Sequence, residues 1–222
     1  MGKMKIREWK TYNDKENLFS TQSFEGNKDL YDYWGYDFIY REIYNWEHSE
    51  TGCIYEMWDC NLRDGDVVVD LGANLGFFSV RAAENASRVV AVDGSPEAYS
   101  CLVENCKDFS NIQTLNASIL SEGSNPSWLW SYKGNPLRMT LEEMMEIYSL
   151  EKIDFLKCDI EGGEYDLFRS LSRETLDKID RIAIETHDEE QNKDFYLPGK
   201  VRHSFVWNYG GGSQMMLYFV SQ

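Results

Sequence analysis

Three consecutive valines that lead through an acidic residue into a glycine-rich turn constrain the fold of this chain most. Residues 67–69 are the valines, Asp70 follows them, and Gly72 and Gly76 bracket the turn. An amphipathic segment, residues 77–86, comes next. Short unbroken apolar runs are typical of strands that are buried on both faces of a parallel sheet. The stretch therefore predicts a buried parallel strand, a tight turn, and a helix whose N-terminus faces a crevice.

The two glycines of the turn have different predicted purposes. Gly72 has no Cβ, so either a ligand can lie against its backbone or the chain can take a positive φ. Gly76 is expected to let the helix start close to the sheet. Their spacing, Gly-x-x-x-Gly, lacks the third glycine of the dinucleotide fingerprint Gly-x-Gly-x-x-Gly. Because a pyrophosphate needs that triple-glycine turn, the spacing disfavours a Rossmann dehydrogenase.

A second predicted strand, residues 88–93, consists of Arg88, the apolar run 89–92 and a final Asp93. In a doubly wound sheet, an acid at the end of the second strand can accept hydrogen bonds from ribose hydroxyls. The site therefore suits a nucleoside without a pyrophosphate, and S-adenosylmethionine meets both conditions. We expect Asp70 near the methionine end of that cofactor and Asp93 near its ribose. An ordinary α/β turn with two acids at strand ends by chance is the structural alternative.

Four segments carry a resemblance to a known family: VDLGANLG (residues 69–76), LKCDIEGGE (156–164), MTLEE (139–143) and REIY (41–44). They resemble the FkbM-type, class I S-adenosylmethionine-dependent methyltransferases over about residues 37–185. The Asp-x-Glu-Gly-x-Glu pattern is the more specific of the two long motifs. In one departure, the family usually has Glu-Pro where this chain has Asp93-Gly94, a shorter carboxylate on a looser turn.

The resemblance and the strand ends together predict the positions that bind S-adenosylmethionine. Ala117 is included because it follows the third predicted strand, at a corner that contacts the adenine in the resembling family. The cofactor-binding prediction comprises Asp70, Gly72, Ala73, Asn74, Gly76, Asp93, Gly94, Ser95, Ala117 and Asp159.

Polar residues follow the fourth and fifth predicted strands. Asp159 and Glu161 come after the fourth strand, and Glu185 and His187 come after the fifth. The first, fourth and fifth strands are neighbours in this topology, so these groups should converge on one rim of the sheet. If extended geometry persists, the two members of each pair share a face.

Methyl transfer to a hydroxyl requires positioning, a dry cavity and removal of a proton. We predict that Asp159, Glu161 and His187 are catalytic, with His187 as the base, oriented by Glu185 or Asp159. A divalent cation held by Asp159, Glu185 and His187 is the alternative, but no spacing here fixes a ligand geometry, so no metal is expected. The structural alternatives are that Asp159 caps the next helix and that His187 is an ordinary surface group.

The predicted fold is α/β, a Rossmann-like class I methyltransferase fold with a doubly wound, mostly parallel sheet. A C-terminal antiparallel hairpin completes it, with arms at about 201–208 and 214–220. The predicted strands are residues 67–71, 88–93, 112–115, 153–157 and 179–184, and the predicted helices are 77–86, 96–107, 141–148 and 164–171.

Residues 1–62 are predicted to form an arm and a small aromatic cap, packed on a methyltransferase domain of residues 63–222, as one structural domain. The first 25 residues are polar and unpatterned, which is typical of a mobile arm. Alternating aromatics at 36–40 favour a strand, and residues 50–61 favour a short helix. Trp128 and Trp130 share a side of any local strand and predict either a lid over the substrate or an edge hairpin.

The formal net charge of −16 over 222 residues argues against a nucleic-acid substrate and against an anionic membrane surface. No apolar run has the length of a membrane span, and the first ten residues lack an apolar signal segment. Five cysteines without framework spacing indicate reduced thiols and a cytoplasmic location. The expected partner is a small-molecule acceptor rather than a nucleic acid or a membrane.

The leading functional hypothesis is O-methylation of a small polar acceptor, such as a sugar or a glycosylated metabolite. The resemblance suggests O-methylation, whereas the spacing by itself indicates only the binding of S-adenosylmethionine. N-methylation of a small molecule or protein side chain, and a non-catalytic binding module with the same fold, are the alternatives.

Overall fold

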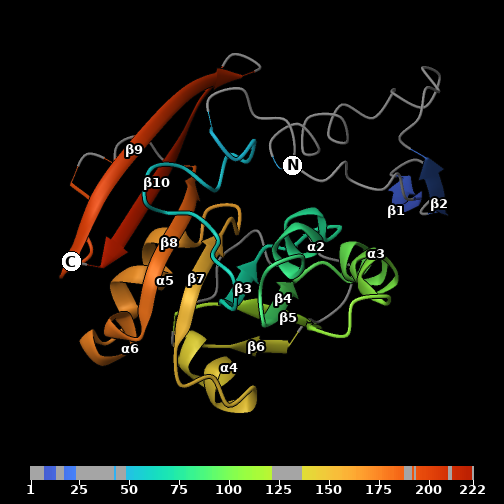
Figure 1. Cartoon of the computed structure of the whole chain (residues 1–222), viewed down its shortest axis with the longest axis horizontal. Helices are drawn as coiled ribbons and strands as arrows, with labels where there is room; N and C mark the ends of the chain where they lie inside the picture. The colour runs from blue at the N-terminus through green and yellow to red at the C-terminus, as the bar shows by residue number, and fades with distance from the viewer. Residues whose placement is uncertain are drawn as a thin grey trace.

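An eight-stranded mixed sheet forms the centre of the structure (Figure 1). The computed structural model describes residues 8–13, 18–23, 43, 49–121, 137–187, 192, 194–209 and 212–221. The sheet consists of β3 (Val67–Leu71), β4 (Arg88–Asp93), β5 (Ile112–Ile119), β6 (Leu137–Met139), β7 (Ile153–Cys158), β8 (Ile179–Thr186), β9 (Lys200–Tyr209) and β10 (Gly212–Ser221). Its helices are α2 (Phe77–Ala83), α3 (Pro96–Cys106), α4 (Leu141–Ile147), α5 (Glu164–Ser170) and α6 (Arg173–Asp177).

The strand order is β6-β5-β4-β3-β7-β8-β10-β9. The strands from β6 to β8 pair in parallel, whereas β10 is antiparallel to both β8 and β9. The order reverses beside β3, which pairs with β4 on one side and β7 on the other. This topology confirms the predicted Rossmann-like class I methyltransferase fold with its C-terminal antiparallel hairpin. It also fixes a switch point at the carboxyl ends of β3 and β7, where ligands of such sheets bind.

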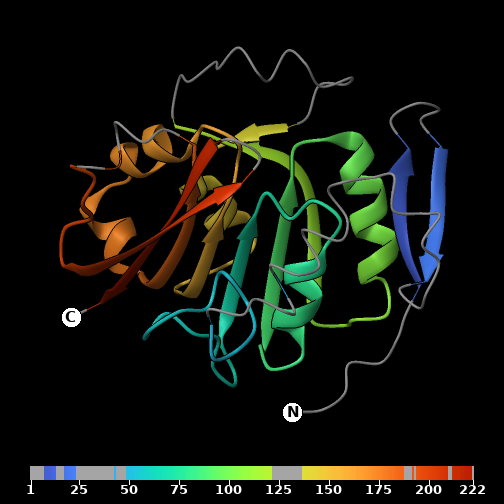
Figure 2. The same ribbon diagram turned by 90° about the horizontal axis from the view of Figure 1, so that it is seen from above.

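Helices cover both faces of the sheet, as Figure 2 shows from above. Side-chain alternation directs Val68 toward the core under α2 and α3, and Val69 toward the core under α4, α5 and α6. The strands are therefore apolar on both sides, which explains the unbroken valine run. All five cysteines are buried and free. In the described ranges no helix is both long and apolar enough to cross a membrane.

The prediction of a helix at residues 50–61 was wrong, because the structure has turns and an isolated bridge there. Tertiary hydrogen bonds hold this segment in place of helical ones. Arg81 donates to the Thr51 carbonyl at 2.9 Å and to Glu56 Oε1 at 2.6 Å. The segment buries Ile54 and Tyr55 against the sheet.

Four further elements were not predicted. β6 and α6 are short, and an antiparallel hairpin of β1 (Glu8–Asn13) and β2 (Leu18–Ser23) lies in the segment that was expected to be an unpatterned arm. β1 lies alongside α3 (Figure 1). The predicted strand at 36–40 and the predicted lid of Trp128 and Trp130 fall outside the described residues.

Candidate functional site

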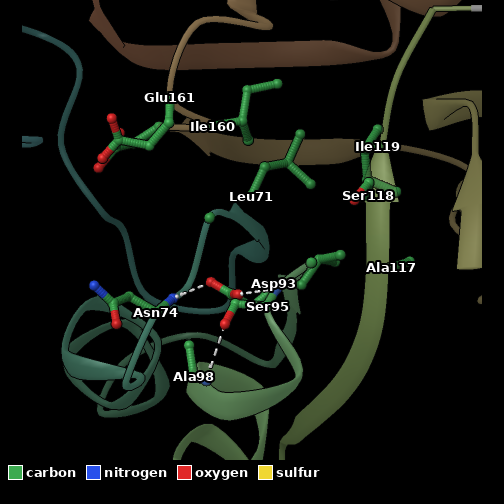
Figure 3. A pocket seen from close by; sticks show the side chains of 14 residues that line it. Leu71, Asn74, Asp93, Ser95, Ala98, Ala117, Ser118, Ile119, Ile160 and Glu161 are labelled. Carbon is green, nitrogen blue, oxygen red and sulfur yellow. Dashed lines mark hydrogen bonds between the residues drawn. The ribbon is translucent and has the colours of Figure 1, made fainter. Parts of the chain in front are cut away.

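An open cavity of about 240 Å³ lies at the carboxyl ends of β3, β4, β5 and β7 (Figure 3). It is at the switch point of the sheet, where the sequence predicts the cofactor. The predicted cofactor positions that line it are Gly72, Asn74, Asp93, Gly94, Ser95, Ala117 and Asp159. The remaining three predictions, Asp70, Ala73 and Gly76, lie outside this lining.

Asp93, the last residue of β4, is fixed between the two turns that bound the cavity. Its Oδ2 accepts from the Asn74 backbone N–H at 2.7 Å, and its Oδ1 accepts from the Ser95 backbone N–H at 2.8 Å. Figure 3 shows the carboxylate at the centre of this arrangement. Burial raises the pKa of Asp93 to about 6, although the two backbone hydrogen bonds act in the opposite direction. The carboxylate is thus oriented and still has acceptor capacity toward the cavity.

Three residues of the lining carry buried side-chain oxygens that have no hydrogen-bond partner in the described part of the chain. They are Asn74 Oδ1, Ser118 Oγ and Asp159 Oδ1. Buried polar groups in native proteins are almost always paired, so these atoms indicate a polar ligand. Hydroxyl and amino groups of a nucleoside and an amino acid would satisfy them, so the residues present fit S-adenosylmethionine. Ser118 was not among the predicted site residues, because a serine after a predicted strand carries no distinctive signal.

The structure gives the two turn glycines packing roles. Gly72 has a φ of +73°, and a Cβ there would lie 1.7 Å from the Asp159 carbonyl oxygen. Glycine is therefore required at position 72 because Asp159, directly after β7, lies so close to the turn. This contact accounts for the glycine without a bound ligand. At Gly76, a Cβ would lie 2.8 Å from Leu102 Cδ1 on α3. This glycine brings α2 close to α3, not to the sheet as expected.

Asp70 faces away from the cavity, because alternation along β3 places it on the α2 side, opposite Leu71. It is fully buried and accepts a hydrogen bond from Ser79 Oγ at 2.6 Å. Lys157 Nζ lies 3.2 Å from Asp70 Oδ1 and donates to the Gly72 carbonyl at 2.6 Å. Despite burial, the charges of Asp70 and Asp159 raise the pKa of Lys157. Asp70 therefore pairs with the buried ammonium of Lys157 and does not face the site expected for the methionine end of the cofactor.

Asp159 joins the cavity to a second polar cluster behind it. Tyr55 Oη lies 3.1 Å from Asp159 Oδ2 and 3.1 Å from Glu185 Oε2. Lys157 Nζ lies 3.9 Å from the same Asp159 oxygen. Burial, together with the charge of Asp159, raises the pKa of Glu185. Neither Tyr55 nor Lys157 was among the predicted site residues, although the sequence did place Tyr55 in the aromatic N-terminal region.

His187 is held by two glutamates, Glu161 and Glu164, that were not predicted as its partners. Nδ1 lies 3.1 Å from Glu164 Oε1 and Nε2 lies 3.3 Å from Glu161 Oε2. Although burial favours the neutral ring, the hydrogen bond to Glu164 and the charges of Glu164 and Glu161 raise the pKa of His187 to about 9. An imidazolium at neutral pH cannot accept a proton, so the predicted role of His187 as the base is not supported.

Glu164 is fully buried at the start of α5 and also accepts from the Gly162 backbone N–H at 3.0 Å. Although burial acts against it, these hydrogen bonds hold the pKa of Glu164 below its usual value. Glu161 has a φ of +56°, so the extended geometry expected from Asp159 onward does not persist. The Glu161 side chain is exposed at the rim of the cavity.

Asp159, Glu161 and His187 each offer one ligand-type atom, and these atoms lie within 4.8 Å of one another. These three residues could hold a divalent cation. The set expected from the sequence contained Glu185 in place of Glu161, but Glu185 faces Tyr55. Glu161 and His187 already pair with each other in the structure.

The model of the methyltransferase FkbM domain matches residues 70–210. A tRNA (guanine(37)-N(1))-methyltransferase of Aedes aegypti is 36% identical over 82 residues, which are 29% of this chain and 15% of the length of that protein. Methyltransferase 1 of Beauveria bassiana is 21% identical over 192 residues, 68% of this chain and 74% of that protein. A solved rRNA methylase of Streptococcus thermophilus has a TM-score of 0.48 at 16% identity, over 72% of this chain and 90% of that one. Since the family model spans well over half of the chain, the chain belongs to the FkbM family of S-adenosylmethionine-dependent methyltransferases.

Proposed function

We propose that the chain transfers a methyl group from S-adenosylmethionine to a hydroxyl of a small polar acceptor, such as a sugar or a glycosylated metabolite. The observation that carries this proposal is the position of Asp159. Its carboxylate lines the cofactor cavity with one buried oxygen unpaired among the described residues, while the other oxygen is hydrogen-bonded by Tyr55. An oriented carboxylate with an available oxygen is the group that a weakly acidic hydroxyl needs to lose its proton.

The residues of the cavity divide into those that bind the nucleoside and those that border the reaction. Asp93 would accept hydrogen bonds from the ribose hydroxyls, and the unpaired oxygens of Asn74 and Ser118 would bind further polar groups of the cofactor. The apolar side chains of Leu71 and Ile119 would exclude water around the adenine ring of the nucleoside.

The proton of the acceptor hydroxyl passes to the carboxylate of Asp159, which lines the cavity. When bound, S-adenosylmethionine supplies an electrophilic methyl group on a sulfonium. The ammonium of Lys157 lies 3.9 Å from Asp159 Oδ2 and balances part of the negative charge there. The imidazolium of His187 compensates the charges of Glu161 and Glu164, which would otherwise add to the negative charge of the rim. With these two cations in place, the reaction needs no metal ion.

The acceptor is proposed to be small and not anionic. The exposed carboxylate of Glu161 borders the cavity, and the whole chain carries a net charge of −16. Both repel phosphate-rich ligands, so a nucleic acid is a poor acceptor by charge. Hydroxyl groups, in contrast, are good donors to carboxylates.

The test is transfer of a labelled methyl group to a panel of neutral sugars, glycosides, amines and unmodified tRNA. We expect an O-methylated sugar or glycoside as the product, identified by NMR. Asp159→Asn should lower kcat by about 100-fold or more, the scale of general-base catalysis, with S-adenosylhomocysteine affinity nearly unchanged. Prior dialysis against EDTA should leave the rate unchanged. Methylated nitrogen or tRNA as the main product would refute the acceptor class, and loss of activity in EDTA would refute the metal-free route.

A further inference from the structure

Tyr55 connects two carboxyl groups from neighbouring strands. Its hydroxyl oxygen lies 3.1 Å from Asp159 Oδ2, beyond the end of β7, and 3.1 Å from Glu185 Oε2 on β8. Tyr55 is 3% exposed and Glu185 is 6% exposed, so water does not compete for these contacts. The proposed proton transfer uses Asp159 but assigns no role to Tyr55 or Glu185.

The number of available protons determines the direction of these hydrogen bonds. A tyrosine hydroxyl donates one hydrogen bond and accepts others, whereas an ionised carboxylate only accepts. Tyr55 can therefore donate to only one of its two partners, and the other partner must itself carry a proton. Asp159 lies 3.9 Å from the ammonium of Lys157 and is partly exposed. Glu185 is buried and has no ion pair among the described residues, so the proton belongs on Glu185.

We propose that Tyr55 is a positioning residue for the base Asp159, and that a protonated Glu185 directs the Tyr55 hydroxyl by donating a hydrogen bond to its oxygen. The chain of hydrogen bonds runs from Glu185 through Tyr55 to Asp159 Oδ2. It leaves Asp159 Oδ1 without a hydrogen-bond partner among the described residues. This inference rests on the proposed function of Asp159 as the base.

The surroundings of the Tyr55 ring support a positioning role. Lys157 Nζ lies over the ring, 5.1 Å from its centroid, and the Phe78 ring packs edge-on at 5.5 Å. Both contacts use the ring and leave the hydroxyl position unchanged. A Tyr55→Phe substitution therefore keeps these ring contacts and removes the hydrogen bonds to the two carboxyl groups.

Tyr55→Phe should lower kcat by about 10- to 100-fold, the effect of a base held in the wrong geometry. KM for S-adenosylmethionine and the Kd of S-adenosylhomocysteine should remain within about twofold, because the cavity residues are unchanged. Tyr165→Phe is the matched control: Tyr165 is also 3% exposed and donates to Asn192, but it lies in the core under α4, α5 and α6. It should keep the wild-type kcat. An unchanged kcat in a folded Tyr55→Phe variant would overturn the positioning role.

Glu185→Gln distinguishes a protonated Glu185 from an ionised one. The side-chain amide that this substitution introduces can still donate to the Tyr55 oxygen, so kcat should stay within about threefold of wild type. In the Tyr55→Phe background the same substitution should have no additional effect, because Glu185 acts only through Tyr55. A loss in Glu185→Gln as large as that in Tyr55→Phe would show that Glu185 is needed as an anion.

A readout without turnover separates this inference from the proposed function. In protein with ¹³C-labelled glutamate carboxyl groups, the Glu185 resonance is assigned by its loss in Glu185→Gln. At neutral pH its chemical shift should be that of a protonated carboxyl group, in wild type and with S-adenosylhomocysteine bound. A carboxylate shift would overturn the hydrogen-bond chain. If no acceptor is methylated, the proposed function fails and the NMR result still decides the state of Glu185.

Discussion

At the scale of single residues, neighbours and burial determine what each polar group of the site can do. Asp93 and Glu164 are both carboxylates at the sheet edge, yet their pKa values move in opposite directions. Burial raises the pKa of Asp93. Hydrogen bonds from His187 and Gly162 lower the pKa of Glu164, although burial acts in the opposite direction. The predicted base, His187, is in turn made an imidazolium by its glutamate partners. Residue type alone therefore does not identify the base.

The affinity for S-adenosylhomocysteine should fall as the pH falls through about 6. Hydroxyl groups of the ligand donate to the ionised Asp93 carboxylate, so protonation of Asp93, with its pKa of about 6, competes with binding. Asp93→Asn should weaken binding by about 1.5–3 kcal/mol and remove this pH dependence. Calorimetric titration at about pH 5 and pH 7.5 measures both effects. An affinity in wild type that does not change between these pH values would contradict the assignment.

His187 should stabilise the folded chain at neutral pH and lose this effect in alkali. Its pKa is raised from 6.5 to about 9 in the folded protein, so the folded state binds the proton more tightly than the unfolded state. The stabilisation is fully present below pH 6.5 and is lost as the pH rises through about 9. The difference in Tm between wild type and His187→Gln should therefore be large at about pH 6 and small at about pH 10. A constant difference would mean that the imidazolium is not paired in this way.

At the scale of elements, the turn after β3 and the loop after β7 lie against each other, and both contain left-handed backbone. Gly72 and Asn74 have φ values of +73° and +49°, and Glu161 and Gly162 have +56° and +104°. The β3 turn was predictable, since the valine run and the glycines identify it from local sequence. The contact of Gly72 with Asp159 was not predictable, because these residues are far apart in the sequence and meet only through the pairing of β3 with β7.

Gly72→Ala should destabilise the chain more than Gly65→Ala. Both positions have positive φ, +73° and +85°, so each variant bears the cost of a left-handed alanine, about 1–2 kcal/mol. Around Gly65 nothing lies within 4 Å of a new Cβ, whereas at Gly72 the Asp159 carbonyl oxygen is 1.7 Å away. Urea unfolding of the two variants measures the difference. Equal losses would show that the β7 loop moves aside without cost.

At the scale of the whole molecule, two apolar cores on either side of the sheet hold a chain that carries a large negative charge. Two buried acids show how the cores accommodate it: Asp66 is 6% exposed and is paired with Arg181 at 2.7 Å, and Asp70 is paired with Lys157. The unbalanced charge is therefore mainly at the surface, where it opposes the compact state by self-repulsion.

Salt should stabilise the fold. Raising NaCl from about 0.02 M to 0.3 M shortens the screening length below the spacing of many surface charges and weakens their repulsion. The buried pair of Asp66 and Arg181 is screened much less, so its contribution should persist. We expect a rise in Tm, measured by differential scanning calorimetry without ligand. A Tm that falls with salt would indicate that surface ion pairs outweigh the repulsion.

The sequence by itself determined the parallel sheet, the switch point and the acid at its second strand. These follow from local rules: a strand buried on both faces needs an unbroken apolar run, and a tight turn needs glycine. Asp93, Asn74 and Asp159, which the sequence predicted to bind the cofactor, line the cavity. Each of them follows a recognisable strand or lies in the glycine-rich turn. Family membership was likewise readable from two continuous motifs.

Only the tertiary structure decided which polar side chains meet and in which protonation state. Tyr55 reaches Asp159 and Glu185 from a segment without regular structure, whose path depends on hydrogen bonds to α2. Whether Asp70 faces the ligand or a buried lysine depends on strand pairing, which no local pattern reports. The pKa of His187 likewise depends on partners from another loop. Electrostatic interactions and burial act through space between residues distant in sequence, so the chemistry of this site emerges only when the chain is folded.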